Sequence, residues 1–244
     1  MPTFRIPLVA ASAAAALIVP AAAADAPRPI VTLKGSISPS RNLRPGTPLD
    51  FTLDTRIASD PPGADLVVQR IVYLFPHGTI VNGRLFPSCS AATLQRAHGR
   101  LSACPRGSQV GAGTASGTAV AIGVTSHARV TLFNGPGGRS VTINVSVTTP
   151  ALINATFAAP LDTLHGRYAN KLTVVLPKQL KRILDGDIVT SDVHVTTGAT
   201  RLVHGVRRGY VEALRCPTRG GAHIHGEVTF EGGATGRADT TVAC

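Results

Sequence analysis

The sequence predicts an all-β protein: a Greek-key, immunoglobulin-like β-sandwich with two short helices, held by two disulfides. Three observations support this fold class. Apolar and polar residues alternate over many short segments rich in β-branched side chains. The 25 Gly and 18 Pro supply turns between these segments. The four cysteines lie in two groups along the chain, 89 with 104 and 216 with 244, and a hydrophobic content of 43% suffices for a core.

The strands are expected where alternation is strongest. Residues 49–57 alternate clearly, with Leu49, Phe51 and Leu53 on one face. Residues 66–75 form a more continuous apolar run, which favours a central strand, and residues 79–85 are expected to pair with it across a turn. Further strands are expected at residues 30–37, 109–122, 127–133, 140–148, 153–158, 172–176, 188–196, 201–206, 210–214, 222–230 and 238–242.

Two short helices are expected to interrupt the strands. Ser90 is a suitable N-cap for a helix over residues 91–98, which Gly99 would end. A second helix is expected over residues 177–185, because its apolar residues fall on one side and its basic residues on the other. We expect this second helix to cover the sandwich as a lid, and a helix that binds a partner or touches a membrane is the alternative.

The amino terminus reads as a cleaved signal peptide over residues 1–24. Arg5 supplies the positive charge, residues 6–20 are uncharged and apolar, and residues 22–24 are three alanines before Asp25. The alternative is a membrane anchor, but the apolar stretch is shorter than the roughly 20 residues that a spanning helix needs. We expect export, no transmembrane segment after cleavage, and a secreted or cell-wall associated protein.

Residues 25–244 are expected to form a single domain. Residues 134–138 contain the turn sequence Asn-Gly-Pro-Gly-Gly. This sequence is typical of a hairpin turn between two strands. A boundary between two subdomains at the same segment is the alternative.

The even number of cysteines favours disulfides in an exported protein. Four cysteines allow three connectivities. We expect Cys89 to pair with Cys104 and Cys216 with Cys244, because each pair brackets its own local unit. Zinc is the competing interpretation, but the sequence contains no Cys-x-x-Cys spacing.

The chain is basic, with 24 Lys and Arg against 13 Asp and Glu and a formal net charge of +11. Basic exported proteins are attracted to anionic polymers. The candidate contacts lie in two groups: Lys178, Lys181 and Arg182, then Arg207 and Arg208. An anionic cell-wall polymer or another envelope protein is the expected partner, and a generic surface charge is the alternative. Nucleic acid is not expected, because aromatic residues do not interleave with the basic ones.

One segment has the residue types of a metal site. His223 and His225 would project from the same face of a strand, together with Glu227. Two histidines at this spacing can bind one zinc or copper ion if a third ligand, such as His194 or His204, comes from elsewhere. The alternative is the solvent-facing side of an ordinary amphipathic strand.

No catalytic motif is present, and the sequence predicts neither an enzyme nor a cofactor. A Gly-x-Ser-x-Gly nucleophile elbow does not occur. Residues 111–117 are rich in glycine but match neither a dinucleotide-binding nor a P-loop spacing. A strand of small residues with close backbone approach explains this segment better.

Two local patterns carry a resemblance to a known group of proteins. The first is Cys89-Ser90, followed after a short helix by Ala103-Cys104-Pro105 and by glycines around Val110. The second is Cys216-Pro217, an amphipathic strand, a Gly-Gly turn and the final Cys244. Together they resemble uncharacterised exported β-rich proteins of high-GC Gram-positive bacteria. The resemblance implies export and a sandwich-like fold, and it implies no activity.

These observations predict a secreted, non-catalytic binding or structural module of the cell envelope. Two other hypotheses stay open. One is a metal-binding or redox protein that uses His223 and His225. The other is a carrier of an apolar ligand held between two sheets.

Overall fold

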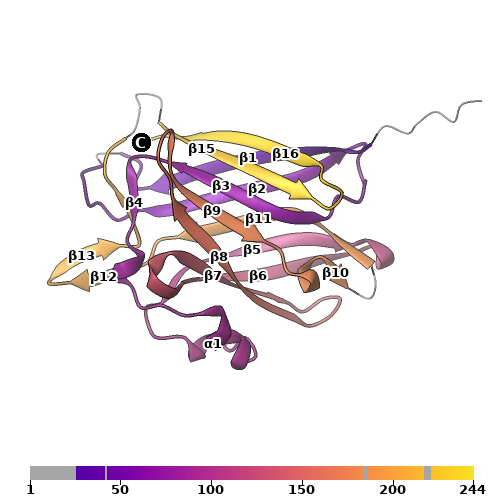
Figure 1. The fold of residues 1–244 in the computed structure, drawn as a ribbon, viewed down its shortest axis with the longest axis horizontal. Helices are drawn as coiled ribbons and strands as arrows, with labels where there is room; N and C mark the ends of the chain where they lie inside the picture. Colours follow the sequence, from indigo (N-terminus) through magenta and orange to yellow (C-terminus); the bar gives the residue numbers. More distant parts are fainter. Residues whose placement is uncertain (1–25, 42, 184–185, 217–220) are drawn as a thin grey trace, which may run out of the picture.

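The computed structural model describes residues 26–41, 43–183, 186–216 and 221–244. The all-β prediction is confirmed. Sixteen strands, one α-helix and five short 3-10 helices occur among these residues (Figure 1). None of the helices in this part of the chain is long and apolar enough to cross a membrane. The expected signal peptide lies outside the described residues.

Twelve strands form one antiparallel sheet. Eleven of them follow the order β1-β2-β11-β5-β6-β7-β8-β9-β3-β15-β16, and β10 pairs with β11. Their bounds are β1 Arg28–Ser38, β2 Asp50–Asp60, β3 Val68–Pro76, β5 Gln109–Ala119, β6 Val124–Asn134, β7 Ser140–Val147, β8 Ile153–Thr163, β9 Tyr168–Val175, β10 Arg182–Ile183, β11 Gly186–Thr197, β15 Ala222–Phe230 and β16 Thr235–Val242. The sheet curls until β1 and β16, its two ends, lie side by side. This near-closed sheet does not confirm the predicted Greek-key, immunoglobulin-like sandwich.

The ends of the sheet meet through glycines. A Cβ atom on Gly35 of β1 would lie 2.8 Å from Cγ2 of Val242 in β16. A Cβ atom on Gly236 of β16 would lie 2.5 Å from Cγ2 of Val31 in β1. Because glycine has no side chain, the inner faces of the two strands can approach closely there. We call this contact between β1 and β16 the seam.

Asn134 is the last residue of β6, and residues 135–138 lie in the connection to β7, which pairs with β6 as a hairpin within the same sheet. Both strands contribute to one hydrophobic cluster through Val130, Leu132, Val141 and Ile143.

The glycine-rich segment 111–117 forms most of β5. A Cβ atom on Gly113 would lie 2.8 Å from Cα of Val195, and one on Gly117 would lie 2.8 Å from the carbonyl oxygen of Val189. Both neighbours are backbone atoms of β11, the strand paired with β5. The interpretation of this segment as a strand with close backbone approach is confirmed.

The first expected helix is confirmed as α1, Ala91–Arg96. Ser90 caps it by accepting a hydrogen bond of 3.1 Å from the backbone N–H of Thr93. The backbone turns at Gly99, whose φ is +74° and whose N–H donates to the carbonyl of Leu94. The helix lies beneath β7 and β8 (Figure 1).

The second expected helix is wrong over its described part. Lys178–Leu180 form a single 3-10 turn, η5, and Arg182–Ile183 form β10. A helix this short would leave most of its backbone N–H and C=O groups without partners. Pairing with β11 supplies partners instead, including a hydrogen bond from the N–H of Ile188 to the carbonyl of Lys181.

Two smaller pairings also correct the sequence-based expectations. β4, Thr79–Val81, pairs with β14, Val211–Ala213, rather than with β3. Both hydrogen-bonding edges of β3 are already occupied by β9 and β15. The strand expected over 201–206 is a projecting hairpin of β12, Thr200–Val203, and β13, Val206–Gly209 (Figure 1).

Both expected disulfides are present. Cys89 and Cys104 have Cα atoms 5.3 Å apart and enclose α1. Cys216 and Cys244 have Cα atoms 5.7 Å apart and enclose the β15–β16 hairpin. Each bond therefore closes a local unit by joining its two ends.

Candidate functional site

The apolar interior of the curled sheet consists of two clusters. One brings together side chains from β1, β2, β3, β15 and β16, next to the seam. The other is formed mainly by β6, β7 and β8, on the opposite side of the ring. Leu172, Val174 and Val195 contact both clusters, yet each of them is only half-buried. Inward-facing aliphatic side chains that keep accessible surface indicate an interior that is not completely filled.

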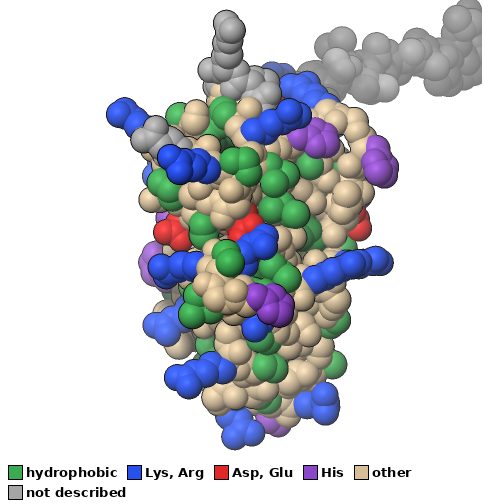
Figure 2. All heavy atoms as spheres, turned by 90° about the vertical axis from the view of Figure 1, so that its left-hand side faces the viewer, with side chains coloured by type: hydrophobic (Ala, Val, Ile, Leu, Met, Phe, Trp, Pro, Cys, Tyr) green, Lys and Arg blue, Asp and Glu red, His purple; other side chains and the backbone are tan. Residues whose placement is uncertain are grey.

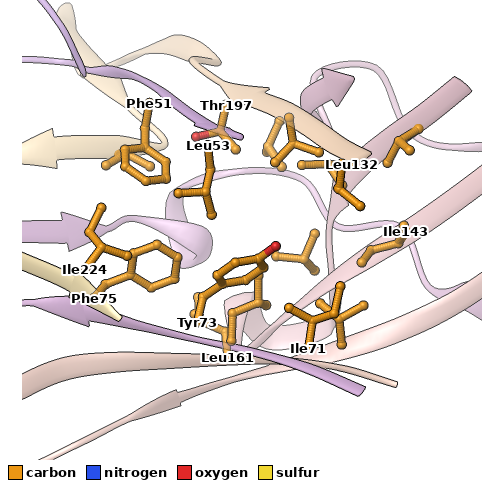
Figure 3. Close-up of a pocket in the computed structure, with 18 of the residues that line it drawn as sticks. Phe51, Leu53, Ile71, Tyr73, Phe75, Leu132, Ile143, Leu161, Thr197 and Ile224 are labelled. Carbon is orange, nitrogen blue, oxygen red and sulfur yellow. The ribbon is translucent and has the colours of Figure 1, made fainter. Parts of the chain in front are cut away.

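A cavity of about 270 Å³ lies between the two clusters. Its lining comes from both and is almost entirely aliphatic and aromatic (Figure 3). It extends from Phe75 and Tyr210, near the carboxyl terminus, to Ile153 and Leu180 near the opposite end of the strands. The side chains that face one another across it include Phe51, Leu53, Ile71, Leu132, Ile143 and Ile224.

Two tyrosines line the cavity, and the first has a partner. A hydrogen bond of 2.7 Å joins the hydroxyl oxygens of Tyr73 and Thr55. Burial raises the pKa of Tyr73 to about 12, although the bond with Thr55 acts in the opposite direction. This phenol is therefore uncharged throughout the physiological range, and its hydrogen-bonding capacity is used within the protein.

The hydroxyl of the second tyrosine, Tyr210, is not hydrogen-bonded as that of Tyr73 is. The Tyr210 side chain is buried, and its ring packs edge-on against Phe86 with centroids 5.5 Å apart. Its hydroxyl has no hydrogen-bond partner among the described residues, and neither has the buried hydroxyl of Thr197, which also lines the cavity. Leaving such a group unsatisfied costs about 1–3 kcal/mol. Burial raises the pKa of Tyr210 to about 12, so this hydroxyl is also uncharged.

One side of the cavity is closed by the segment that connects β9 to β11, because β8 and β9 are not paired along their whole length. β8 and β9 pair only where residues 161–163 meet residues 170–172, and they diverge beyond that point (Figure 1). Leu176, Leu180 and Ile183, from the segment around η5 and β10, line the cavity at this divergence. We call residues 176–183 the cover. The lid expected here is therefore present as a covering segment, although it is not a helix.

Ion pairs hold the cover in place and involve residues expected to contact polyanions. Lys181 and Arg182 each lie 2.7 Å from the carboxylate of Glu231, in the turn between β15 and β16. Arg182 also pairs with Asp187 at 2.9 Å. The Lys181 ammonium group is the main cause of a lowered pKa at Glu231. Lys178 is exposed beside them.

The second basic group lies on the projecting hairpin. Arg208 donates two hydrogen bonds of 2.8 Å to the buried carboxylate of Glu212, and Arg207 bonds to Thr200. The end of the molecule that carries this hairpin has Lys and Arg side chains spread over its surface, among hydrophobic ones (Figure 2). The residues expected to bind a polyanion therefore form two separate groups, and three of the five engage carboxylates of the protein itself.

The histidines of β15 share one face of the strand, as expected, and this is the outer face of the sheet. His223 and His225 lie on the outer face, while Ile224 and Val228 are buried. Each histidine bonds to the residue opposite it on β16. His223 lies 2.8 Å from the Thr241 hydroxyl, and His225 lies 2.9 Å from the Asp239 carboxylate.

The two histidines considered as a third ligand lie on other elements. His194, on β11, lies 2.5 Å from the Asp54 carboxylate of β2. His204 is at the tip of the β12–β13 hairpin, with a φ of +48°. In the described part of the chain, no group of three His, Cys, Asp or Glu side chains is placed to hold a metal.

The sequence analysis did not identify Tyr210, Thr197 or the cover as parts of one site. The sequence does contain a weak indication of unfilled interior space. It lies in β5 and β6, where the inward positions include Ala115, Gly117 and Ala128. Small residues on facing strands leave space unless large side chains across the interior fill it. The chain has few aromatic residues and no Trp with which to do so.

No family model matches this sequence, and the searches of curated proteins and of solved structures found no match either. The site must therefore be interpreted from its own geometry.

Proposed function

We propose that the protein binds and carries an elongated apolar ligand inside its curled sheet. The observation that supports this is the cavity of about 270 Å³ between two core clusters, with its aliphatic and aromatic lining. Protein interiors normally pack as densely as organic crystals. Apolar cavities of about 150 Å³ already stay dry and accept small apolar molecules.

The shape of the sheet supports the same function. Barrels of about eight strands can enclose one small ligand, and more strands give a wider interior. Here eleven strands, each hydrogen-bonded to the next in the sheet, surround the interior. Divergence of β8 and β9 gives a route to the cavity that leaves the pairing of these two strands intact, because the cover and not a paired strand closes the cavity there.

An exported carrier is consistent with the two disulfides. We therefore retain export to the cell envelope as part of the proposal. The surface charges support an envelope-binding role less well, because Lys181, Arg182 and Arg208 already have carboxylate partners.

The first test is uptake of diphenylhexatriene, an uncharged apolar fluorophore, by the purified protein. We expect saturable binding at one site, and native mass spectrometry of freshly purified protein should detect a co-purified apolar molecule. Ala128→Leu, which extends a side chain into the cavity, should weaken uptake at least tenfold. Arg129→Leu is the matched control, because Arg129 is the adjacent, exposed position on the same strand. Equal uptake by both variants, or none by the wild type, would exclude an internal apolar site.

A further inference from the structure

The hairpin of β12 and β13 projects from one end of the molecule and exposes apolar side chains (Figure 1). Leu202 is 70% exposed and Val206 is 59% exposed. Among the large hydrophobic residues of the described segments, Leu152 alone is more exposed than Leu202. Single exposed apolar side chains are common on protein surfaces, but a pair of them on a projecting element indicates a contact with an apolar partner.

The turn of the hairpin holds this pair in a defined place. β12 and β13 are paired as far as Val203 opposite Val206, so the turn consists of His204 and Gly205. Both turn residues have positive φ values, +48° and +77°. Tight two-residue turns of this kind match the natural twist of two paired strands. The apolar side chains therefore stand on a regular hairpin.

Arginines flank the apolar side chains. Arg207 lies directly opposite Leu202, so both side chains project from the same face of the hairpin. Arg207 is exposed and donates to the hydroxyl of Thr200. Arg201 is also exposed and donates to the carbonyl oxygen of Leu85. Because both acceptors are neutral oxygens, these two positive charges are not neutralised within the described part of the protein.

Two other segments belong to the same end of the molecule. Residues 77–86 pair with residues 199–216, the segment that contains the hairpin, through β4 and β14. Residues 43–50 contact the same segment, since the N–H of Gly46 donates to the carbonyl of Ala213. We call these three segments together the hairpin end.

The hairpin end has an excess of positive charge. Its segments contain six arginines and two acidic residues, Asp50 and Glu212. Asp50 is exposed, whereas Glu212 is buried and paired with Arg208. Ile80 and Leu214 add further exposed aliphatic side chains. Figure 2 shows this end of the molecule, with basic and hydrophobic side chains intermingled on its surface.

We infer that the hairpin end docks the protein onto a lipid bilayer that contains anionic lipids. Leu202 and Val206 would insert among the headgroups, and Arg201 and Arg207 would contact the lipid phosphates. Surface-bound elements hold to bilayers through the apolar area they bury and through the attraction of their cations to anionic lipids. Docking does not depend on the proposed function, because none of these four residues lines the cavity.

The combination of charge and apolar exposure favours a bilayer over other partners. A soluble anionic polymer would attract the arginines but would leave Leu202 and Val206 in water. A second copy that docked through the same surface would cover these two side chains. It would also bring the unneutralised arginines of both copies together, and like charges repel. An anionic bilayer accommodates the positive charge and the apolar side chains at once.

Co-sedimentation with vesicles tests the docking. The wild type should bind vesicles of phosphatidylcholine with phosphatidylglycerol at least tenfold more tightly than vesicles of phosphatidylcholine alone, and less tightly as salt is added. Arg207→Gln should weaken this binding about fivefold, the contribution of one cation near an anionic surface. Leu202→Ser should weaken it about tenfold, because less apolar surface is buried.

Leu152→Ser and Arg129→Gln are the matched controls. Leu152 is 82% exposed between β7 and β8, and Arg129 is exposed on β6. Both lie outside the hairpin end, so these variants should bind the vesicles as the wild type does. If they lose as much affinity as the hairpin variants, binding reflects the overall composition of the surface and the docking site is wrong.

An introduced tryptophan reports insertion directly. The chain contains no Trp, so a single substitution gives the protein one indole. The emission of Leu202→Trp should shift to shorter wavelength on the anionic vesicles, and lipids with brominated acyl chains should quench it. The emission of Leu152→Trp should not change. This measurement also shows insertion in a folded protein, which circular dichroism of the same sample confirms.

The remaining outcomes identify the other partners. Equal binding to the anionic vesicles and to soluble polyphosphate, with no shift in Leu202→Trp, would mean that the surface binds polyanions, and docking would be wrong. A dimer in sedimentation that Leu202→Ser dissociates would mean that the surface joins two copies, and docking would again be wrong. Uptake of diphenylhexatriene is measured without vesicles, so failure of either proposal leaves the test of the other unaffected.

Discussion

Lys181 and Glu231 form an ion pair of 2.7 Å that ties the cover of the cavity to the turn between β15 and β16. The two residues are 50 positions apart in the chain. Arg182 reinforces the contact by pairing with the same carboxylate. A single side chain, Glu231, therefore pairs with two of the three basic residues of the cover.

Acid should loosen the cover. The pKa of Glu231 is lowered in the folded protein, so the contribution of its ion pairs is complete above the ordinary pKa of the carboxyl group and is lost as pH falls through the lowered value. We expect weaker protection from hydrogen exchange in residues 176–183 below that pH, measured by mass spectrometry relative to the intrinsic amide exchange rate at each pH. In Glu231→Gln this protection should already be weak at neutral pH and should change little in acid. Unchanged exchange in this variant would show that the ion pairs do not hold the cover.

Glu212 should contribute more than Glu231 to the stability of the whole protein. Its carboxylate is buried at 1% exposure and accepts hydrogen bonds from Arg208 and from the backbone N–H of Gly209. Glu212→Gln removes the charge from this site and should lower the midpoint of thermal unfolding by several degrees. Because hydrogen bonds from Arg208 lower its pKa, the stabilisation is lost as pH falls, and the variant should be less acid-sensitive than the wild type.

Glu227→Gln is the control for that measurement. Glu227 pairs with Arg237 at 2.8 Å on the outer face, where the arginine side chain is 65% exposed. Pairs of this kind contribute about 0–1 kcal/mol. An equal fall in the midpoint of thermal unfolding of the two variants would mean that the burial of Glu212 adds nothing to the stability of the protein.

Gly113→Ala should destabilise the pairing of β5 with β11. The new methyl group would lie 2.8 Å from Cα of Val195, and backbone atoms cannot move aside as a flexible side chain can. We expect a loss of about 2 kcal/mol or more in urea unfolding, within the range found for overpacked interiors. Ala112→Val, at the exposed neighbouring position of β5, should change stability by less than about 0.5 kcal/mol.

Ser90→Ala should remove the N-cap of α1. The Ser90 hydroxyl accepts the backbone N–H of Thr93, and losing such a cap costs about 1 kcal/mol. Ser90→Asp keeps an acceptor at the same position and should retain most of the stability. Circular dichroism at increasing urea concentrations measures both variants. Because Cys89 and Cys104 hold the ends of this segment, the loss should not release the loop from the sheet.

Much of the secondary structure was predictable because its causes are local. Alternation of apolar residues located the long strands to within a few residues, and Ser90 and Gly99 marked the limits of α1. The disulfide pairs followed from the fact that each encloses one local unit.

The strand order could not be predicted in the same way. His194 of β11 meets Asp54 of β2 across 140 positions, and no local pattern encodes such a pairing. The segment 201–206 was expected as one strand, but positive φ values at His204 and Gly205 turn it into a hairpin.

The cavity was the least predictable feature. Alternation shows which side chains point inward, and it identified Phe51 and Leu53 correctly as neighbours on one face. It does not show how far those side chains lie from the opposite wall. The unpaired state of the Tyr210 hydroxyl depends on every group around it, so only the three-dimensional arrangement reveals it.

The seam has a consequence for the size of the interior. When every strand of a barrel is hydrogen-bonded to the next, strand number and stagger fix its diameter. Here β1 and β16 are the two ends of the hydrogen-bonded order, and Gly35 and Gly236 bring their inner faces into contact. Sliding or parting of these faces changes the circumference without breaking a ladder. If the interior carries the proposed ligand, we therefore expect this one chain to accept ligands of different thickness by widening at the seam.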